Sequence, residues 1–168
     1  MKLNVATELK LSGREGHASF SERMEDIEYP GIWVRFAEPV DVEISYVFDG
    51  KGFETTGRVK TALKAECARC TKELVVPFEQ EFSERFEKNV DPDGEVYSFS
   101  GEELDLSDLV RDTILLNMDN YVLCKEDCRG LCPVCGCDLN TVQCSCEHEA
   151  KDNPFSKLKA LFNEDKEV

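Results

Sequence analysis

Val40-Asp-Val-Glu-Ile-Ser-Tyr-Val-Phe48, followed by the four residues Asp49-Gly-Lys-Gly52, is the stretch that decides the fold of this chain. Apolar and polar residues alternate along it, so one face of an extended strand would be apolar throughout. The four residues after it tolerate a positive φ, which a tight turn between antiparallel strands requires. A second alternating run follows, in which the apolar face carries Val59, Thr61, Leu63, Ala65 and Cys67. The pattern predicts a β-hairpin.

Three further segments have strand character. Residues 74–86 form a third period-two run, with Leu74, Val76, Phe78, Phe82 and Phe86 on one face. Shorter strands are expected at Ile32–Phe36 and near the N-terminus, where the apolar residues are Leu3, Val5, Leu9 and Leu11. Residues 12–31 are polar and contain glycine, and they predict a long loop.

The strands give way to helical signals in the last third. Residues 87–103 are acidic and predict an exposed loop, after which Asp105-Leu-Ser-Asp108 resembles a capping box. The helix it would start carries an apolar stripe of Leu106, Leu109, Val110, Thr113 and Ile114, with Leu116 as a further member. Asn153-Pro154 predicts a short C-terminal helix with Phe155, Leu158, Leu161 and Phe162 on one side. The expected class is α+β: a mostly antiparallel β domain with an acidic loop and one packed helix (residues 1–118), then a cysteine-rich segment with a short helix (119–168).

Composition limits the setting in which this chain works. No apolar run approaches the roughly 20 residues that span a bilayer, and the charged N-terminus does not resemble a signal peptide, so a cytoplasmic location without membrane contact is expected. The formal net charge is −15, and residues 61–123 alone carry 6 basic and 15 acidic side chains. Such a surface repels nucleic acid except at a local basic patch, and favours a basic protein partner.

Seven of the nine cysteines lie between Cys124 and Cys146. A core uses cysteine singly as a small hydrophobe, so this density indicates a metal, and a reducing cytosol disfavours disulfides. Cys132-Pro-Val-Cys135-Gly is the surest half-site, because Pro133 fixes one backbone angle of the turn and Gly136 permits a positive φ. Four sulfurs would close a tetrahedron around a structural zinc ion. Four ligands are expected from the six candidates Cys124, Cys128, Cys132, Cys135, Cys144 and Cys146.

The sequence alone does not decide which cysteines form the second half of this site. Either Cys124 with Cys128 or Cys144 with Cys146 could complete the tetrahedron, and His148 is a further candidate. Cys67-Ala-Arg-Cys70, between two predicted strands, has the spacing of a metal knuckle and could contribute to a second four-sulfur site, whereas Cys137 is expected to bind nothing. All-sulfur ligation predicts a closed, non-catalytic site, and the sequence has neither a phosphate-binding glycine loop nor a nucleophile elbow. We therefore expect no enzymatic activity and no small-molecule substrate.

The order of these motifs resembles the YceD family, the large ribosomal RNA subunit accumulation proteins of bacteria and plastids. The resemblance covers about residues 40–162 and rests on five blocks: Cys67-Ala-Arg-Cys70, Leu104-Asp-Leu-Ser-Asp-Leu-Val, the run from Cys124 through Cys128-Arg-Gly-Leu-Cys132-Pro-Val-Cys135-Gly to Asp-Leu-Asn140, Cys144-x-Cys146, and Asn153-Pro-Phe-x-x-Leu158. It implies a role in accumulation of large-subunit ribosomal RNA. Some relatives keep C-x-R-C but lack the later cysteines, so Cys67, Arg69 and Cys70 are candidates for the shared role and the zinc knuckle for a stabilising addition.

Taken together, the sequence predicts a non-enzymatic assembly factor that engages a basic ribosomal protein or the pre-ribosomal large subunit through an acidic belt at Asp91–Asp112. A direct RNA-binding zinc knuckle is the alternative, with rRNA contacts from Lys125, Arg129, Lys151, Lys157 and Lys159 and stacking on Phe155. Many relatives have Asp-Pro-Arg where this chain has Asn153-Pro154-Phe155, which removes one cation from that surface. A thiol oxidoreductase centred on Cys67 and Cys70 ranks last, because such thiols are usually activated at a helix N-terminus.

Overall fold

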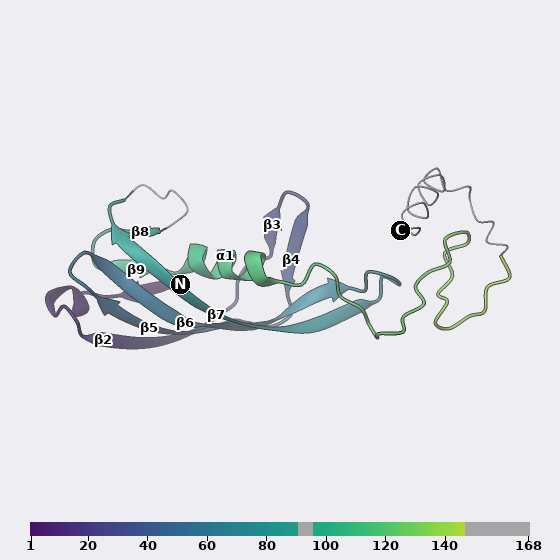
Figure 1. Ribbon diagram of the computed structural model, residues 1–168, viewed down its shortest axis with the longest axis horizontal. Helices are drawn as coiled ribbons and strands as arrows, with labels where there is room; N and C mark the ends of the chain where they lie inside the picture. The colour runs from purple at the N-terminus through teal and green to yellow at the C-terminus, as the bar shows by residue number, and fades with distance from the viewer. Residues whose placement is uncertain (91–95, 147–168) are drawn as a thin grey trace, which may run out of the picture.

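The computed structural model of the chain describes residues 1–90 and 96–146. Within these ranges it contains a seven-stranded sheet, a two-stranded sheet, one short 3₁₀ helix and one α-helix (Figure 1). The large sheet consists of β2 (Glu15–Glu22), β3 (Ile27–Tyr29), β4 (Ile32–Phe36), β5 (Val40–Phe48), β6 (Gly52–Glu66), β7 (Glu73–Lys88) and β8 (Tyr97–Phe99). The small sheet pairs β1 (Lys2–Asn4) with β9 (Glu103–Asp105), and the helices are η1 (Glu8–Lys10) and α1 (Ser107–Asn117). Every strand pair is antiparallel except β7 with β8, so the mostly antiparallel α+β class is confirmed.

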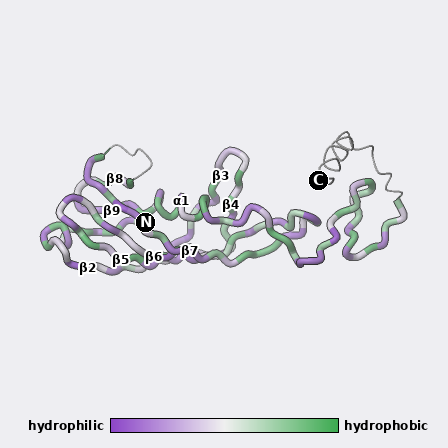
Figure 2. Tube along the Cα trace, in the orientation of Figure 1, coloured by the Kyte–Doolittle hydropathy of each residue, from purple (hydrophilic) through white to green (hydrophobic). Residues whose placement is uncertain are grey.

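The hairpin predicted from the alternating runs is confirmed as β5 and β6. Its register runs from Asp41 opposite Lys60 to Phe48 opposite Phe53. Asp49 closes the turn, because its Oδ1 accepts the backbone N–H groups of Lys51 (2.7 Å) and Gly52 (2.8 Å). Burial follows the sequence alternation, and Figure 2 shows the corresponding change of hydropathy along the strands.

β6 and β7 form a second, much longer hairpin. Their ladder runs from Gly52 opposite Glu87 to Glu66 opposite Glu73, which is 15 residue pairs and therefore about 50 Å of strand. β5 accompanies only the first half, and β4 pairs with the second half only through Arg35 and Phe36. The far end of the hairpin thus extends beyond the rest of the sheet, and its turn is formed by the sequence from Cys67 to Lys72 (Figure 1).

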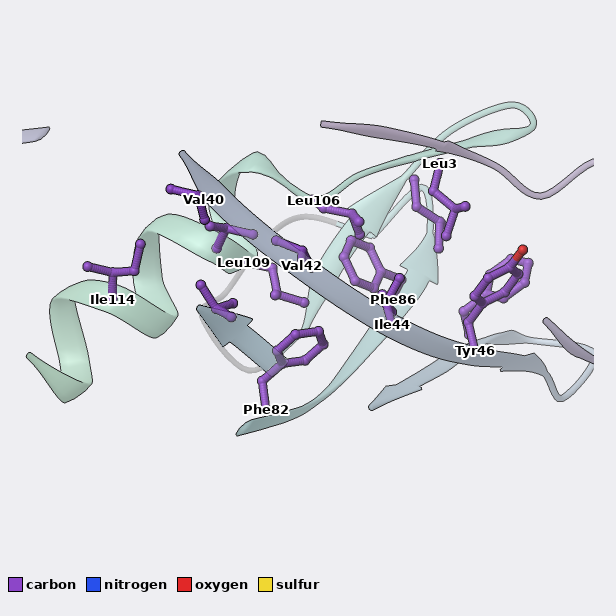
Figure 3. Packing of buried hydrophobic residues seen from close by; sticks show 14 of the residues in the cluster. Leu3, Val40, Val42, Ile44, Tyr46, Phe82, Phe86, Leu106, Leu109 and Ile114 are labelled. Carbon is purple, nitrogen blue, oxygen red and sulfur yellow. The ribbon is translucent and has the colours of Figure 1, made fainter. Parts of the chain in front are cut away.

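The hydrophobic core lies between the large sheet and α1. Figure 3 shows Leu109 of the helix next to inner-face residues of the strands, among them Val42. Phe53 is fully buried, and its ring packs against those of Phe48 and Phe99 at centroid distances of 5.0 and 5.4 Å. The predicted apolar stripe of the helix is confirmed except for Leu116, which is 83% exposed.

Helix α1 starts near the predicted position but without the predicted reciprocal capping box. Asp105 Oδ1 accepts the backbone N–H of Ser107 at 3.0 Å, which satisfies one of the free donors at the helix start. Asp108 forms an ion pair with Arg111 at 2.9 Å. The carboxylate of Asp108 therefore pairs with a side chain one turn further along the helix surface and does not cap the helix start.

Three sequence expectations were wrong. The segment 12–31 is not one long loop, because it contains β2 and β3; β2 pairs along its whole length with β5. Leu9 lies in the 3₁₀ helix η1 rather than in a strand, and Leu11 follows it. The acidic segment 87–103 contains the end of β7, the short strand β8 and the start of β9, and Phe99 within it is buried.

The predicted C-terminal helix after Asn153 lies outside the described residues. In the part of the chain that the structure does describe, no helix is long and apolar enough to cross a bilayer.

Candidate metal centres

The first candidate centre joins the turn of the long hairpin to the segment that follows α1. Cys67 and Cys70 come from the turn, and Cys124 and Cys128 come from the later segment. The Sγ atoms of Cys67 and Cys128 are 3.8 Å apart, and those of Cys70 and Cys124 are 3.6 Å apart. All four sulfurs lie within 4.8 Å of one another. The two half-sites are therefore brought together by the tertiary fold, from positions 54 residues apart in the case of Cys70 and Cys124.

Backbone hydrogen bonds hold the two halves in place. The turn is closed by bonds from Cys67 N to Lys72 O and from Thr71 N to Cys67 O, both 2.9 Å, with Thr71 at a positive φ of 57°. The returning segment docks through Ala68 N, which donates to Val122 O at 2.8 Å. The backbone N–H of Cys124 points at the sulfur of Cys67 at 3.4 Å. Such donors stabilise a thiolate, which is the form that binds a metal.

Arg69, between the two turn cysteines, connects the hairpin to both parts of the later segment. Its Nη1 donates to Cys128 O at 2.9 Å, its Nε to Tyr121 Oη at 3.4 Å, and its carbonyl accepts Leu131 N at 3.0 Å. Gly130 has a φ of +74°, and a Cβ there would lie 2.9 Å from the Arg69 carbonyl, so glycine permits this close approach. The resemblance marked Arg69 as a candidate, but only the structure shows that it contacts the Cys128 carbonyl and the Tyr121 hydroxyl beside the centre.

The second candidate centre is local. Cys132, Cys135, Cys144 and Cys146 converge within 4.8 Å, with Cys144 Sγ at 3.4 Å from that of Cys132 and 3.6 Å from that of Cys135. The first pair lies on a tight turn in which Gly136 N donates to Cys132 O at 2.8 Å and Gly136 has a φ of +74°. The backbone N–H of Val134 lies 3.4 Å from the Cys132 sulfur and that of Cys146 lies 3.4 Å from the Cys144 sulfur.

Asn140 links the two centres, and sequence reasoning assigned it no role beyond its place in the quoted motif. Its Nδ2 lies 3.5 Å from the Cys128 sulfur of the first centre, and its Oδ1 accepts the N–H of Arg129 at 2.9 Å. Its own backbone N–H is held by Asp138 Oδ1 at 2.9 Å. The three residues between Cys128 and Cys132 therefore form a short, hydrogen-bonded bridge from one centre to the other.

The six candidate ligands from the late cysteine block are thus divided between two groups. Cys124 and Cys128 lie with Cys67 and Cys70, whereas Cys132, Cys135, Cys144 and Cys146 form a group of their own. Cys137 belongs to neither group. His17 is on β2, where its Nδ1 lies 2.8 Å from Ser45 Oγ, and His148 lies outside the described residues.

The thiol environments differ within each group. Burial opposes ionisation of Cys67, but backbone N–H groups of Cys124, Arg69 and Cys70 lower its pKa to about 6. Hydrogen bonds from Cys137, first from its backbone and then from its thiol, lower the pKa of Cys135 to about 6. Burial, together with neighbouring thiols, raises the pKa of Cys124 to about 12. Each group therefore contains at least one sulfur that is readily ionised without a metal.

The geometry of both groups fits a four-coordinate metal ion. A tetrahedron with metal–sulfur bonds of ~2.3 Å has sulfur–sulfur edges of about 3.8 Å. The four sulfur–sulfur contacts given above, at 3.4–3.8 Å, are close to this value and far longer than the ~2.05 Å of a disulfide, and all sulfurs of each group lie within 4.8 Å of one another. Four thiolates with no histidine are typical of structural zinc sites. Such a site has no open position for a substrate or a reactive water.

An antiparallel sheet with one packed helix defines a β-rich protein, and its two four-cysteine groups could each hold a metal ion. The chain belongs to the YceD family: the family model described as "Large ribosomal RNA subunit accumulation protein YceD" matches residues 55–162. The matched region runs from β6 through β7, α1 and all nine cysteines, and the resemblance found from the sequence motifs is thereby confirmed.

Curated relatives agree with this assignment. The chain is 35% identical over 60 residues to the chloroplastic YCED homolog 1 of Arabidopsis thaliana and 37% identical over 62 residues to that of Zea mays; each match covers 36% of this chain and 19% or 21% of the relative. It is 27% identical over 130 residues to an uncharacterized protein of Mycobacterium tuberculosis, covering 73% of this chain and 62% of that protein. The chain therefore spans less than two thirds of the length of each of these relatives. No solved structure matches it significantly.

Proposed function

We propose that this chain is a non-enzymatic factor that supports accumulation of large-subunit ribosomal RNA and assembly of the large ribosomal subunit. Membership of the YceD family is the observation that carries this proposal, because the family and its chloroplastic relatives are named for large ribosomal RNA subunit accumulation. The cytoplasmic location expected from the sequence belongs to the same proposal.

Zinc is the metal that the proposal assigns to both four-cysteine groups, with a purely structural role. The all-sulfur donor sets and the sulfur–sulfur separations support this assignment. Apparent zinc affinities of structural sites are ~10–16 kcal/mol, enough to hold together a segment with little hydrophobic core of its own. Thiol redox chemistry is supported less well, since Cys67 is only 1% exposed and could not reach a disulfide on another protein.

A basic ribosomal protein is the partner that the charge distribution favours. The described part of the proposed acidic belt contains exposed Glu102, Glu103 and Asp108, and four thiolates around each divalent ion would add further negative charge. Direct RNA binding at the knuckles has less support among the described residues. Lys125 lies 3.6 Å from Asp127, and Arg69 donates to the Cys128 carbonyl, which leaves Arg129 as the exposed cation of this segment without an ion pair among the described residues.

The test is the ratio of large- to small-subunit ribosomal RNA in cells depleted of this protein. We expect the ratio to fall on depletion and to recover with the wild-type chain but not with the double variant E102K/D108K, which reverses two belt charges. The variant E28K/E126K makes the same change of net charge at exposed sites outside the belt and should restore the ratio. An unchanged ratio on depletion would refute the proposed function. Equal rescue by both variants would remove the belt from the mechanism.

A further inference from the structure

The face of the large sheet that lies opposite α1 has a shallow hollow of about 710 Å³ that crosses four strands. Its floor is a row of hydroxyl and imidazole side chains, one from each strand: His17, Ser45, Thr56 and Ser83. They lie directly opposite one another in the ladders of β2 with β5, β5 with β6 and β6 with β7. Because these residues share one face and one register, the hollow is a trough that runs across the strands.

Longer charged side chains form one wall of this trough. This wall is the next row along the strands, and its members Glu43, Arg58 and Glu81 all line the hollow. On the other side of the floor, the next row on the same face holds Glu15, Val47, Glu54 and Arg85, which flank the hollow without lining it. Rows on one face are about 7 Å apart, so these two rows are about 14 Å apart, which exceeds the ~10 Å that a packed extended chain requires.

The positive charges of the wall and of the flanking row are already neutralised. Arg58 lies 2.8 Å from Glu79 and 3.5 Å from Glu43. Arg85 pairs with Glu54, with Asp49 at 2.9 Å and with Glu87 at 2.8 Å. Glu81 has no ion-pair partner among the described residues, and Glu15 approaches only His17, at 3.8 Å. The trough therefore combines a hydrogen-bonding floor with an excess of carboxylates.

We propose that this trough binds an extended lysine- or arginine-rich segment of a protein partner. The wall carboxylates would pair with its cations, and the hydroxyl groups of the floor would accept hydrogen bonds from its ammonium and backbone N–H groups. The trough crosses three inter-strand spacings of about 4.8 Å, so four or five extended residues would fill it. Single-stranded RNA fits less well, because the unpaired carboxylate of Glu81 repels phosphates and the imidazole of His17 is the one exposed aromatic ring among the residues that line the hollow.

This inference rests on the proposed function, since it names a second surface that a basic partner would occupy, on the sheet, in addition to the acidic belt. The probe is decalysine, titrated calorimetrically into the full-length, metal-loaded protein. The test variant is E43Q/E81Q, which neutralises the carboxylates of the wall. The matched control is E28Q/E126Q, which removes two exposed carboxylates elsewhere and gives the same net charge.

We expect E43Q/E81Q to weaken decalysine binding about tenfold, because two cation–carboxylate contacts are lost, and E28Q/E126Q to change it less than twofold. A second variant, T56Y, should also weaken binding, since it fills the floor without changing the charge and keeps a residue that suits a strand. Equal losses in both double variants would show that attraction is due to net charge alone and would overturn the inference. Tighter binding of a uridine decamer than of decalysine, lost in T56Y, would also overturn it.

Failure of this inference and failure of the proposed function are distinguishable. The ribosomal RNA ratio in depleted cells tests the function without reference to the trough. If that ratio falls while E43Q/E81Q binds decalysine like the wild type, the function stands and the trough is refuted. If the ratio does not change while decalysine still binds as expected, the trough stands as a basic-peptide site in a protein with another role.

Discussion

Replacing Cys67 with serine should remove the first metal centre and leave the second. Serine cannot supply the thiolate, so we expect the metal content to fall from two ions per chain to one. The matched control is C137S, because Cys137 belongs to neither four-cysteine group, and it should retain both ions. C135S should also retain one ion, lost from the other centre.

The two losses should differ in their effect on stability. The first centre closes a loop between Cys70 and Cys124, 54 residues apart, whereas the second closes one of 9 residues between Cys135 and Cys144. Treating each metal as a cross-link of the unfolded chain, loop-closure entropy gives about 4 kcal/mol for the first and about 2.5 kcal/mol for the second. C67S should therefore lower the free energy of unfolding by more than C135S does.

Metal content by mass spectrometry and urea unfolding would measure both effects. Amide hydrogen exchange gives a local reading, since the N–H of Ala68 is bonded to Val122 O and that of Leu131 to Arg69 O. Both amides should lose protection in C67S and keep it in C137S. The reasoning is refuted if C67S still binds two ions, or if C137S loses as much metal as C67S.

Three other predictions concern single side chains. R69A removes the bond to the Cys128 carbonyl, so a chelator should extract metal from the first centre about tenfold faster and from the second centre at an unchanged rate. Equal acceleration at both centres would contradict the assignment of Arg69 to the first centre. F53A should lower the free energy of unfolding by about 3–5 kcal/mol in urea, because the ring is fully buried, whereas F53L should cost less than half of that. Bonds from the backbone N–H of Gly52 and Lys51, together with Arg85, hold the pKa of Asp49 well below its ordinary value, so its stabilising effect is complete above about pH 5 and is lost as the pH falls through the folded-state pKa. The difference in melting temperature between the wild type and D49N should therefore shrink towards low pH, and a constant difference would contradict this assignment.

The strands that the sequence predicted well are those whose alternation is strongest. β5 and β6 bury or half-bury every second side chain over many residues, and β7 buries Phe78, Phe82 and Phe86 with half-buried residues at the alternate positions between them, so a period of two was visible without tertiary information. β2 was missed because it is an edge strand whose inner face begins with Gly16 and Ala18, and small residues give no hydrophobic signal. Gly16 is required by its neighbour, since a Cβ there would collide with the ring of Tyr46. Glycine at this position is therefore explained by the tertiary contact with Tyr46, and not by a local backbone preference.

The candidate centres show the same division between local and long-range information. Spacing alone identifies half-sites, because C-x-x-C geometry is decided within one turn. The partner of Cys67-x-x-Cys70 depends instead on the length of β6 and β7 and on the path of residues 118–123 back along the hairpin. A local sequence motif around the cysteines cannot predict how long β6 and β7 are. Arg69 and Asn140 escaped for a related reason: their partners are a carbonyl and a sulfur that become neighbours only in the folded chain.

The position of the first centre at the end of a 15-pair ladder also bears on the fidelity of folding. A slip of one residue between β6 and β7 would turn every buried side chain outward, and the core alone rejects it. A slip of two residues keeps each side chain on its own face, so hydrophobic burial discriminates against it only weakly. Such a slip moves one strand by about 7 Å, however, whereas metal–sulfur bonds tolerate only tenths of an ångström. The four thiolates therefore meet only after β6 and β7 have paired in the native register, so metal binding would selectively stabilise chains whose longest strands are correctly paired.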